Sequence, residues 1–214
     1  MVCAICKIRR PRRFCPGVNG DICSLCCGTE REVTVSCPFD CPHLRDARKH
    51  DRPVPLAEDQ VPNREIQVSE EFLQQHEALL TAMGQALVTA GLTTPGTIDF
   101  DVREALTALV RTYRTLSSGL YYESVPENPV AAAIFRLLQS GIAAFRAEET
   151  ERLGLASTRD SDVLTILVFF ERLELDRNNG RRRGRAFLDF LRGIYPSSSG
   201  GSETDVSSSS LLVG

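Results

Sequence analysis

Eight cysteines lie within the first 41 residues, and their spacing is that of metal ligands. Two Cys-x2-Cys pairs, Cys3/Cys6 and Cys23/Cys26, are separated by 16 residues. A Cys-x2-Cys pair places two sulfurs on one tight turn, where both can bind a single tetrahedral ion. We therefore expect these four cysteines, called the first set, to form a closed four-thiolate site for structural zinc.

The other four cysteines are expected to hold a second zinc ion in an interleaved site. This second set consists of Cys15, Cys27, Cys37 and Cys41. Adjacent residues such as Cys26 and Cys27 cannot easily point the same way, so each is expected to serve a different metal, and the two can exchange roles. A short helix starting near Cys37 would place Cys37 and Cys41 on one face, and His43 or His50 can replace a cysteine as ligand.

Three other uses of the cysteines are weighed against structural zinc. An iron–sulfur cluster is disfavoured because the cysteines divide into turn-borne pairs instead of one compact run. Disulfide or redox use is disfavoured because no secretory segment is visible, and thiols stay reduced in the cytoplasm. A catalytic zinc keeps an open ligand position, whereas the sulfurs here suffice for closed sites. We expect a cytoplasmic protein with two structural zinc ions.

A family resemblance covers about residues 3–41. The segments Arg13-Phe14-Cys15-Pro16 and Ile22-Cys23-Ser24-Leu25-Cys26-Cys27 resemble the middle of HIT-type zinc fingers. This chain has Gly17-Val18 where that family has a further cysteine, and it lacks the family's histidine. The resemblance implies a small interleaved two-zinc module used mainly for protein contacts. The Cys-rich start also resembles that of bacterial zinc-finger proteins of unassigned activity.

Charge is distributed unevenly along a chain whose net charge is −3. Residues 1–55 hold ten Lys and Arg against six Asp and Glu, a formal +4, and the remainder is at −7. Eight thiolates and two Zn²⁺ would bring the first segment close to zero, because the metal centre carries its own charge. The positive charge of this segment is therefore weak support for nucleic-acid binding.

Two arginine clusters are candidates for binding anions. The first is the loop that carries Arg9, Arg10, Arg12 and Arg13, with Phe14 as a stacking platform. The second is the group Arg181, Arg182, Arg183 and Arg185, which we expect at the start of a helix, where positive charge is unfavourable. The acidic end of the preceding helix, with Glu171, Glu174 and Asp176, offers these arginines a structural pairing instead.

The region from residue 68 to 196 has the pattern of a small helical bundle. Apolar residues recur at helical spacing over about 69–90, 101–118, 129–152, 161–176 and 181–195. Ser69 and Asn128-Pro129 are start signals, and Pro196 ends the last segment. The segment 163–170 is apolar all round, and its length favours a buried helix over a strand.

These patterns predict a mainly α protein with a small two-zinc, zinc-ribbon or treble-clef-like module followed by roughly five helices. The expected divisions are a module at 1–50, a linker at 51–67, a helical domain at 68–196 and a disordered Ser/Gly-rich tail at 197–214. No apolar run is long enough to cross a membrane.

The expected function is non-enzymatic interaction, with protein the first choice of partner. The alternative is a nucleic-acid-binding regulator that uses Arg9–Arg13 and Arg181–Arg185. A third reading, an enzyme using His76 or Tyr121, has no supporting catalytic motif.

Overall fold

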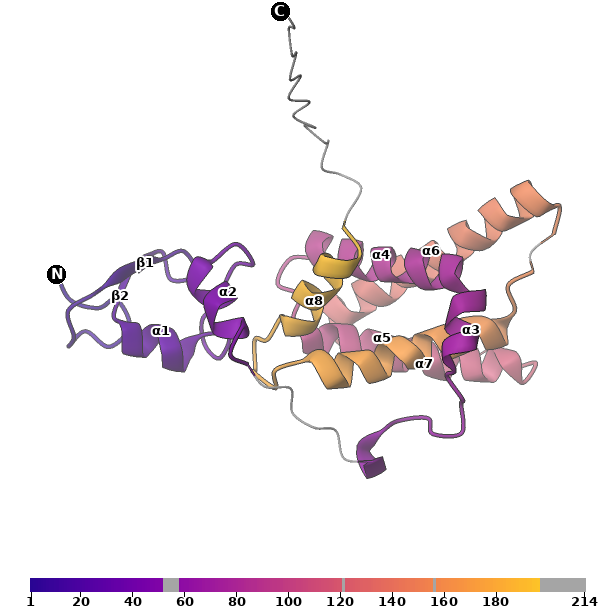
Figure 1. Ribbon diagram of the computed structural model, residues 1–214, viewed down its shortest axis with the longest axis horizontal. Coiled ribbons are helices and arrows are strands. Elements are labelled where there is room, and N and C mark those ends of the chain that lie inside the picture. The colour runs from indigo at the N-terminus through magenta and orange to yellow at the C-terminus, as the bar shows by residue number, and fades with distance from the viewer. Residues whose placement is uncertain (52–57, 121, 156, 197–214) are drawn as a thin grey trace, which may run out of the picture.

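The computed structural model describes residues 1–51, 58–120, 122–155 and 157–196. The Cys module forms one end of an elongated molecule and a bundle of helices forms the other (Figure 1). The only sheet among the described residues has two strands. The predicted class, a mainly α chain with a Cys module ahead of a helical bundle, is confirmed.

The Cys module is built around a short hairpin. Strand β1 (Arg13–Cys15) pairs antiparallel with β2 (Gly20–Ile22), and Phe14 lies opposite Asp21. Helix α1 (Ser24–Glu30) begins directly after the hairpin, and α2 (Pro42–Arg48) completes the module. The order along the chain is a turn with Cys3 and Cys6, the hairpin, and then α1, with Cys23 as its capping residue and Cys26 in its first turn; the choice between a zinc ribbon and a treble clef stays a prediction.

A 3-10 turn, η1, and six α-helices follow in chain order. They are η1 (Glu58–Gln60), α3 (Glu70–Gln75), α4 (Glu77–Thr93), α5 (Asp99–Ser117), α6 (Pro129–Leu153), α7 (Asp160–Arg177) and α8 (Ala186–Ile194). The first expected helix is divided into α3 and α4 at His76, whose φ of −110° and ψ of 27° interrupt the helix. The last expected helix was placed too early, because α8 begins after the four arginines and not with them.

Local signals explain where several helices begin and end. The Ser69 hydroxyl accepts the N–H of Phe72 at 3.1 Å, and the Asn128 side chain accepts the N–H of Val130 at 3.0 Å. These contacts satisfy helix N–H groups that have no partner inside the helix. Gly154 ends α6 with a φ of 80°, a conformation that costs glycine little.

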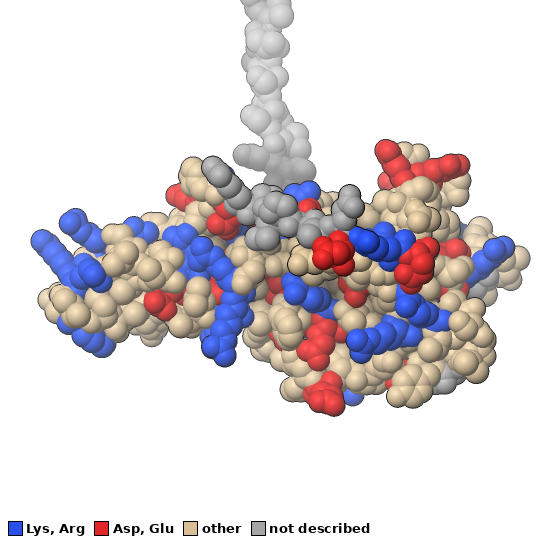
Figure 2. Space-filling model, turned by 90° about the horizontal axis from the view of Figure 1, so that it is seen from below, with Lys and Arg blue, Asp and Glu red and all other residues tan. Residues whose placement is uncertain are grey.

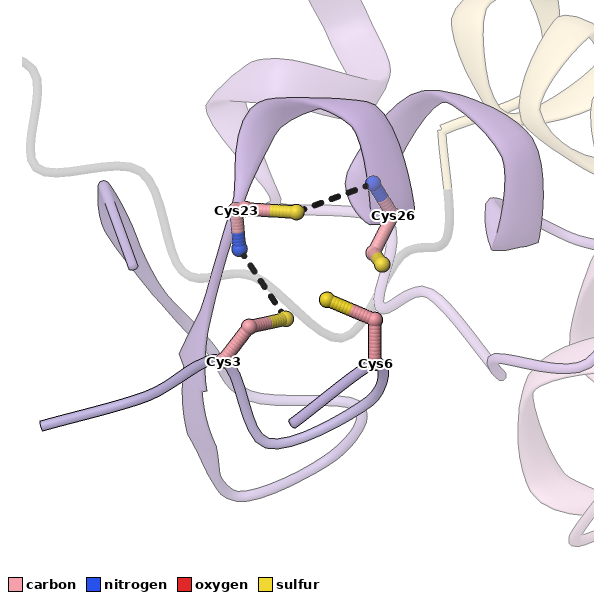
Figure 3. A group of neighbouring side chains, drawn as sticks. All are labelled: Cys3, Cys6, Cys23 and Cys26. Carbon is pink, nitrogen blue, oxygen red and sulfur yellow. Dashed lines mark hydrogen bonds between the residues drawn. The ribbon is translucent and has the colours of Figure 1, made fainter. Parts of the chain in front are cut away.

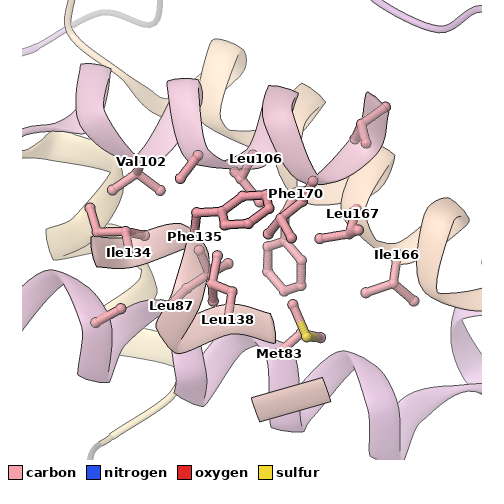
Figure 4. Close-up of a cluster of buried hydrophobic side chains, with 14 of the residues drawn as sticks. Met83, Leu87, Val102, Leu106, Ile134, Phe135, Leu138, Ile166, Leu167 and Phe170 are labelled. Atoms are coloured by element: carbon pink, nitrogen blue, oxygen red, sulfur yellow. The ribbon is translucent and has the colours of Figure 1, made fainter. Parts of the chain in front are cut away.

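The bundle core lies between α4, α5, α6 and α7, with α8 across one end (Figures 1 and 4). Phe135 from α6 and Phe170 from α7 are both fully buried and lie among aliphatic side chains from the other helices. The segment 163–170 is helical, as predicted. It is apolar all round because α7 packs against α4, α5 and α8.

Helix α6 is the one described helix long and apolar enough to cross a membrane by length and composition alone. A core helix of a soluble protein passes the same test. In this structure, α6 contributes Ile134, Phe135, Leu138 and Ile142 to the bundle core.

The later part of the expected linker contacts the bundle. The guanidinium group of Arg172 on α7 donates to the carbonyl oxygens of Pro62, Asn63 and Ile66 at 3.2, 2.6 and 3.0 Å. The side chain of Asn63 also donates to Glu171 at 2.6 Å. Residues 52–57 of the expected linker and the whole expected tail, 197–214, lie outside the described residues.

A buried carboxylate ties the start of α5 to the start of α8. Asp99 is 4% exposed and accepts the N–H groups of Phe187 and Leu188 at 3.0 and 3.2 Å. Burial raises the pKa of Asp99 to about 7, and the nearby Glu174 and Glu32 add to the rise, while the two N–H donors oppose it. Arg185 is the positive group that faces Asp99.

This raised pKa predicts a stability that falls as pH rises. Asp99 titrates near 3.8 when unfolded and near 7 when folded, so the folded chain binds the extra proton between these values. The free energy of unfolding should therefore fall by at most about 1.4 kcal/mol per pH unit from about pH 5 to 7, and level off above. Urea unfolding of the wild type and Asp99→Asn at several pH values tests this prediction. The variant should lose the slope, whereas Asp40→Asn, an exposed control, should keep it.

Candidate metal centre and module interface

The first set of cysteines converges on one point. The sulfurs of Cys3, Cys6, Cys23 and Cys26 all lie within 4.8 Å of one another (Figure 3). In a tetrahedral four-sulfur zinc site with Zn–S distances of about 2.3 Å, the sulfurs stand about 3.8 Å apart. These four cysteines can therefore bind one metal ion with little movement.

Short-range backbone contacts hold the four sulfurs in place. The turn after Cys3 closes with Lys7 N–H donating to the Cys3 carbonyl at 2.9 Å, and Lys7 has a φ of 56°. Cys23 caps α1, and its sulfur accepts the N–H of Cys26 at 3.5 Å. The sulfur of Cys3 accepts the N–H of Cys23 at 3.3 Å, which joins the two pairs.

Burial and the surrounding N–H groups shift the pKa values of these cysteine thiols in different directions. Burial acts to raise the pKa of Cys3, but N–H donors from Cys23, Cys6 and Ile5 outweigh it and bring that pKa down to about 6. The N–H groups of Arg9 and Ile8 lower the pKa of Cys6. Burial and the three neighbouring sulfurs raise the pKa of Cys26 to about 12. A divalent cation resolves this conflict, because it stabilises all four thiolates together.

The second set is gathered in the same small core but does not converge in this way. Cys15 and Cys37 are buried, and Cys27 and Cys41 pack against them. Burial raises the pKa of Cys37, the Glu32 N–H lowers it, and the Glu32 carboxylate and the neighbouring Cys15 and Cys41 raise it further. Among the described residues, the first set is the one metal-ligating group whose ligand atoms all lie within 4.8 Å. The second zinc site, and His43 as a ligand, stay predictions.

The expected helix around the second set was placed wrongly. Helix α2 begins at Pro42, and Cys41 is its capping residue, so Cys37 and Cys41 do not share a helix face. Pro38 and Pro42 account for this, because proline suits the first turn of a helix and not its interior. Cys41 thus stands at the N-terminal end of α2.

Comparison with known proteins gives no match: no family model, no curated protein and no solved structure resembles this chain. The resemblance to HIT-type zinc fingers therefore stays a prediction from the cysteine pattern.

The contact between the Cys module and the bundle centres on Glu32, and no pattern in the sequence indicates it. Glu32 is 1% exposed and has a φ of 53°, which is unfavourable for a residue other than glycine. Its carboxylate accepts from Arg48 at 2.7 Å, from the Asn179 side chain at 2.8 Å and from the Arg185 N–H at 3.1 Å. Its carbonyl accepts the Arg183 N–H at 2.7 Å. Glu32 therefore joins the C-terminal end of α2 to the turn between α7 and α8.

The second arginine cluster lies in this interface. The Arg181 guanidinium donates to the Arg31 carbonyl at 2.7 Å, and that of Arg183 donates to the Ser36 hydroxyl at 2.6 Å. The guanidinium of Arg185 lies 3.7 Å from the ring centroid of Phe39. Of the four arginines, Arg182 is exposed and makes no such contact among the described residues.

The structure therefore corrects the expected pairing of these arginines. Glu171 accepts from Asn63 and Thr107, and Glu174 accepts from Arg103. The acidic end of α7 is thus satisfied within the bundle, and the arginines after it turn to the Cys module. The arginines of the second cluster have a structural role, as the pairing interpretation predicted. Their partners are different, however, and lie about 150 residues away in the chain.

Arg48 and Phe39 complete the interface. Arg48 bridges Glu32 of the module and Asp189 on α8. The ring of Phe39 packs against the bundle core and has a second guanidinium, from Arg192, 4.5 Å from its centroid. A buried ion pair and an anchored aromatic ring fix one position of the module against the bundle.

The side chains of the remaining candidate residues lie outside the Glu32 interface, although the Arg9 carbonyl accepts the N–H of Cys3 in the first set. The first arginine cluster lies at the outer end of the module, and Arg13 alone approaches a cysteine, with its guanidinium 3.8 Å from the Cys27 sulfur. His76 is half-buried, stacks on Phe72 and bonds its carbonyl at 3.0 Å. Its other ring nitrogen lies 3.8 Å from a carboxylate oxygen of Asp162, so His76 is not the core histidine with a single partner that the apolar helix face indicated. Tyr121 lies outside the described residues.

Proposed function

We propose that this chain is a non-enzymatic interaction protein whose Cys module is folded by structural zinc. The observation that carries the proposal is the convergence of four cysteine sulfurs within 4.8 Å. Four sulfurs fill a tetrahedral coordination sphere and leave no open position for a substrate or a reactive water. The metal would therefore act on the fold and not on a substrate.

The module needs such support because its own apolar core is small. Apart from cysteines, its buried apolar side chains are Ile22, Val35 and Leu44. A core of this size does not offset the conformational entropy of about 50 ordered residues. Zinc in small fingers contributes about 10–16 kcal/mol, which exceeds what these three side chains supply.

A second zinc ion in the second set is part of the proposal. Cys15, Cys37 and Cys41 lie close enough for their charges to act on one another. The guanidinium groups of Arg13 and Arg31 lie 3.8 and 4.0 Å from the sulfur of Cys27. All eight cysteines are free, and a reducing compartment such as the cytoplasm would keep them so.

Native mass spectrometry of the intact protein tests the metal content. We expect two zinc ions per chain in the wild type and one in Cys37→Ser, which leaves the first set complete. Ser36→Ala, a change at the neighbouring exposed residue, should retain two. A single ion in the wild type would remove the second site, and bound iron would overturn the zinc assignment.

The bundle offers a surface for a protein partner. A groove of about 490 Å³ runs beside α5, and Phe100 and Val125 in its lining are 57% and 44% exposed. Exposed apolar side chains beside a groove are typical of contact surfaces. The alternative, a nucleic-acid-binding regulator, loses support because three of the four arginines in the second cluster contact the Cys module.

A further inference from the structure

The outer end of the Cys module presents positive and apolar side chains together. This tip surface consists of Val2, Lys7, Ile8, Arg9, Arg10, Arg12, Phe14 and Leu25, all of them exposed. Ile8 is 82% exposed and Phe14 is 58% exposed, so this end of the module displays large apolar side chains as well as charged ones. Lys and Arg side chains gather over this end in Figure 2, which in Figure 1 carries β1 and β2.

The backbone beneath the tip surface is fixed by the metal ligands. The Cys3 N–H donates to the Arg9 carbonyl at 2.9 Å, and the Arg12 N–H donates to the Ile22 carbonyl at 2.9 Å. The positive side chains are therefore displayed on an ordered loop, so this loop loses less backbone entropy when a partner binds.

Within the described part of the chain, the positive side chains of the tip surface have no carboxylate partner, although the zinc–thiolate centre beneath them would carry negative charge. Across the part of the chain that the structure describes, Lys7, Arg9, Arg10 and Arg12 form no ion pair, whereas Arg48 and Arg103 do. The rest of the chain beyond residue 55 carries a formal −7. A negatively charged partner is therefore attracted to the tip surface and repelled from the bundle.

The apolar side chains narrow the choice of partner. Three of the four, Val2, Ile8 and Leu25, are aliphatic and cannot stack on a base as an aromatic ring does. Aliphatic side chains between guanidinium groups instead fit a peptide in which carboxylates alternate with apolar residues. We propose that the tip surface binds an acidic, apolar segment of a partner protein. This inference rests on the proposed function, because the metal fixes the loop.

Fluorescence anisotropy with the full zinc-loaded chain tests the inference. The probe is a labelled peptide of five Asp-Glu-Leu repeats, compared with five Asp-Glu-Ser repeats and with an oligothymidylate of similar length. We expect the leucine peptide to bind most tightly, with an affinity that falls as salt rises. Arg9→Glu/Arg10→Glu/Arg12→Glu should weaken binding about 30-fold or more, and Ile8→Ser/Phe14→Ser about tenfold.

A control with the same change of charge on the bundle is Arg136→Glu/Arg159→Glu/Arg182→Glu, at three exposed positions. This control should bind within about twofold of the wild type. Tighter binding of oligothymidylate would assign the surface to nucleic acid, and equal binding of the serine peptide or equal loss in the control would also overturn the inference. Zinc is counted on the same samples, so failure to bind peptide with zinc present is distinguished from failure of the proposed function, in which zinc is absent.

Discussion

Cys26→Ser is expected to release zinc from the first set and to unfold the Cys module while the bundle stays folded. A serine hydroxyl is a poor zinc ligand, and the three sulfurs that remain would keep an open, weaker site. The module loses its largest source of stability, since Ile22, Val35 and Leu44 are its buried apolar side chains other than cysteine. The bundle keeps its separate core around Phe135 and Phe170.

Hydrogen exchange followed by mass spectrometry measures this effect by segment. Residues 1–50 should lose protection in Cys26→Ser, and α4–α7 should keep it. The far-UV helical signal should fall by only about one eighth, because α1 and α2 hold seven residues each. Ser24→Ala, at an exposed position on the same turn, serves as the control. A module that stays protected in Cys26→Ser, with zinc absent, would refute a metal-dependent fold.

Glu32→Ala is expected to detach the folded Cys module from the bundle. The substitution removes the acceptor for Arg48, Asn179 and the Arg185 N–H, and it leaves Arg48 with Asp189 as its carboxylate partner. Removing one partner of a buried ion pair costs about 3–5 kcal/mol. Alanine retains the unfavourable positive φ of this position, so the loss reports on the carboxylate and not on the backbone.

The measurements are thermal unfolding and hydrogen exchange. We expect one cooperative transition in the wild type and two in Glu32→Ala, with increased exchange at 31–39 and 179–192 and an unchanged zinc content. Glu32→Gln, which retains an acceptor but no charge, should lie between them. Asp46→Ala, which removes an ion pair on the exposed face of α2, should match the wild type. If Glu32→Ala unfolds in the same single transition as the wild type, the carboxylate does not hold the two parts together.

The first set of cysteines could be found from the sequence because its geometry is local. Each Cys-x2-Cys pair fixes two ligands within one turn, so the spacing carries most of the information about Cys3/Cys6 and Cys23/Cys26. The helices were predictable for a related reason, since apolar periodicity records which face of α5 or α7 is buried. The spacing of Cys37 and Cys41 predicts a helix that begins too early, whereas Pro42 marks the residue where α2 begins.

The interface could not be predicted, because nothing local in the sequence identifies it. Glu32 is one acidic residue in a short loop, and the side chains that hold it come from α2 and from the turn before α8. The arginines at 181–185 looked misplaced at a helix end, and their partners are in a loop about 150 positions earlier. Such contacts follow from how the module packs on the bundle, which sequence spacing does not record.

Because of the Glu32 contacts, the Cys module is not an independent unit that can be transferred to another protein unchanged. Cut from the chain at residue 51, it would expose a carboxylate with Arg48 as its one remaining partner, and Phe39 would lose the surface it packs on. Grafted onto another protein, it would carry this defect with it. We therefore expect coordinated substitutions at the positions that form this contact when proteins of this architecture diverge in sequence. These positions are Glu32, Arg48, Asn179 and Asp189.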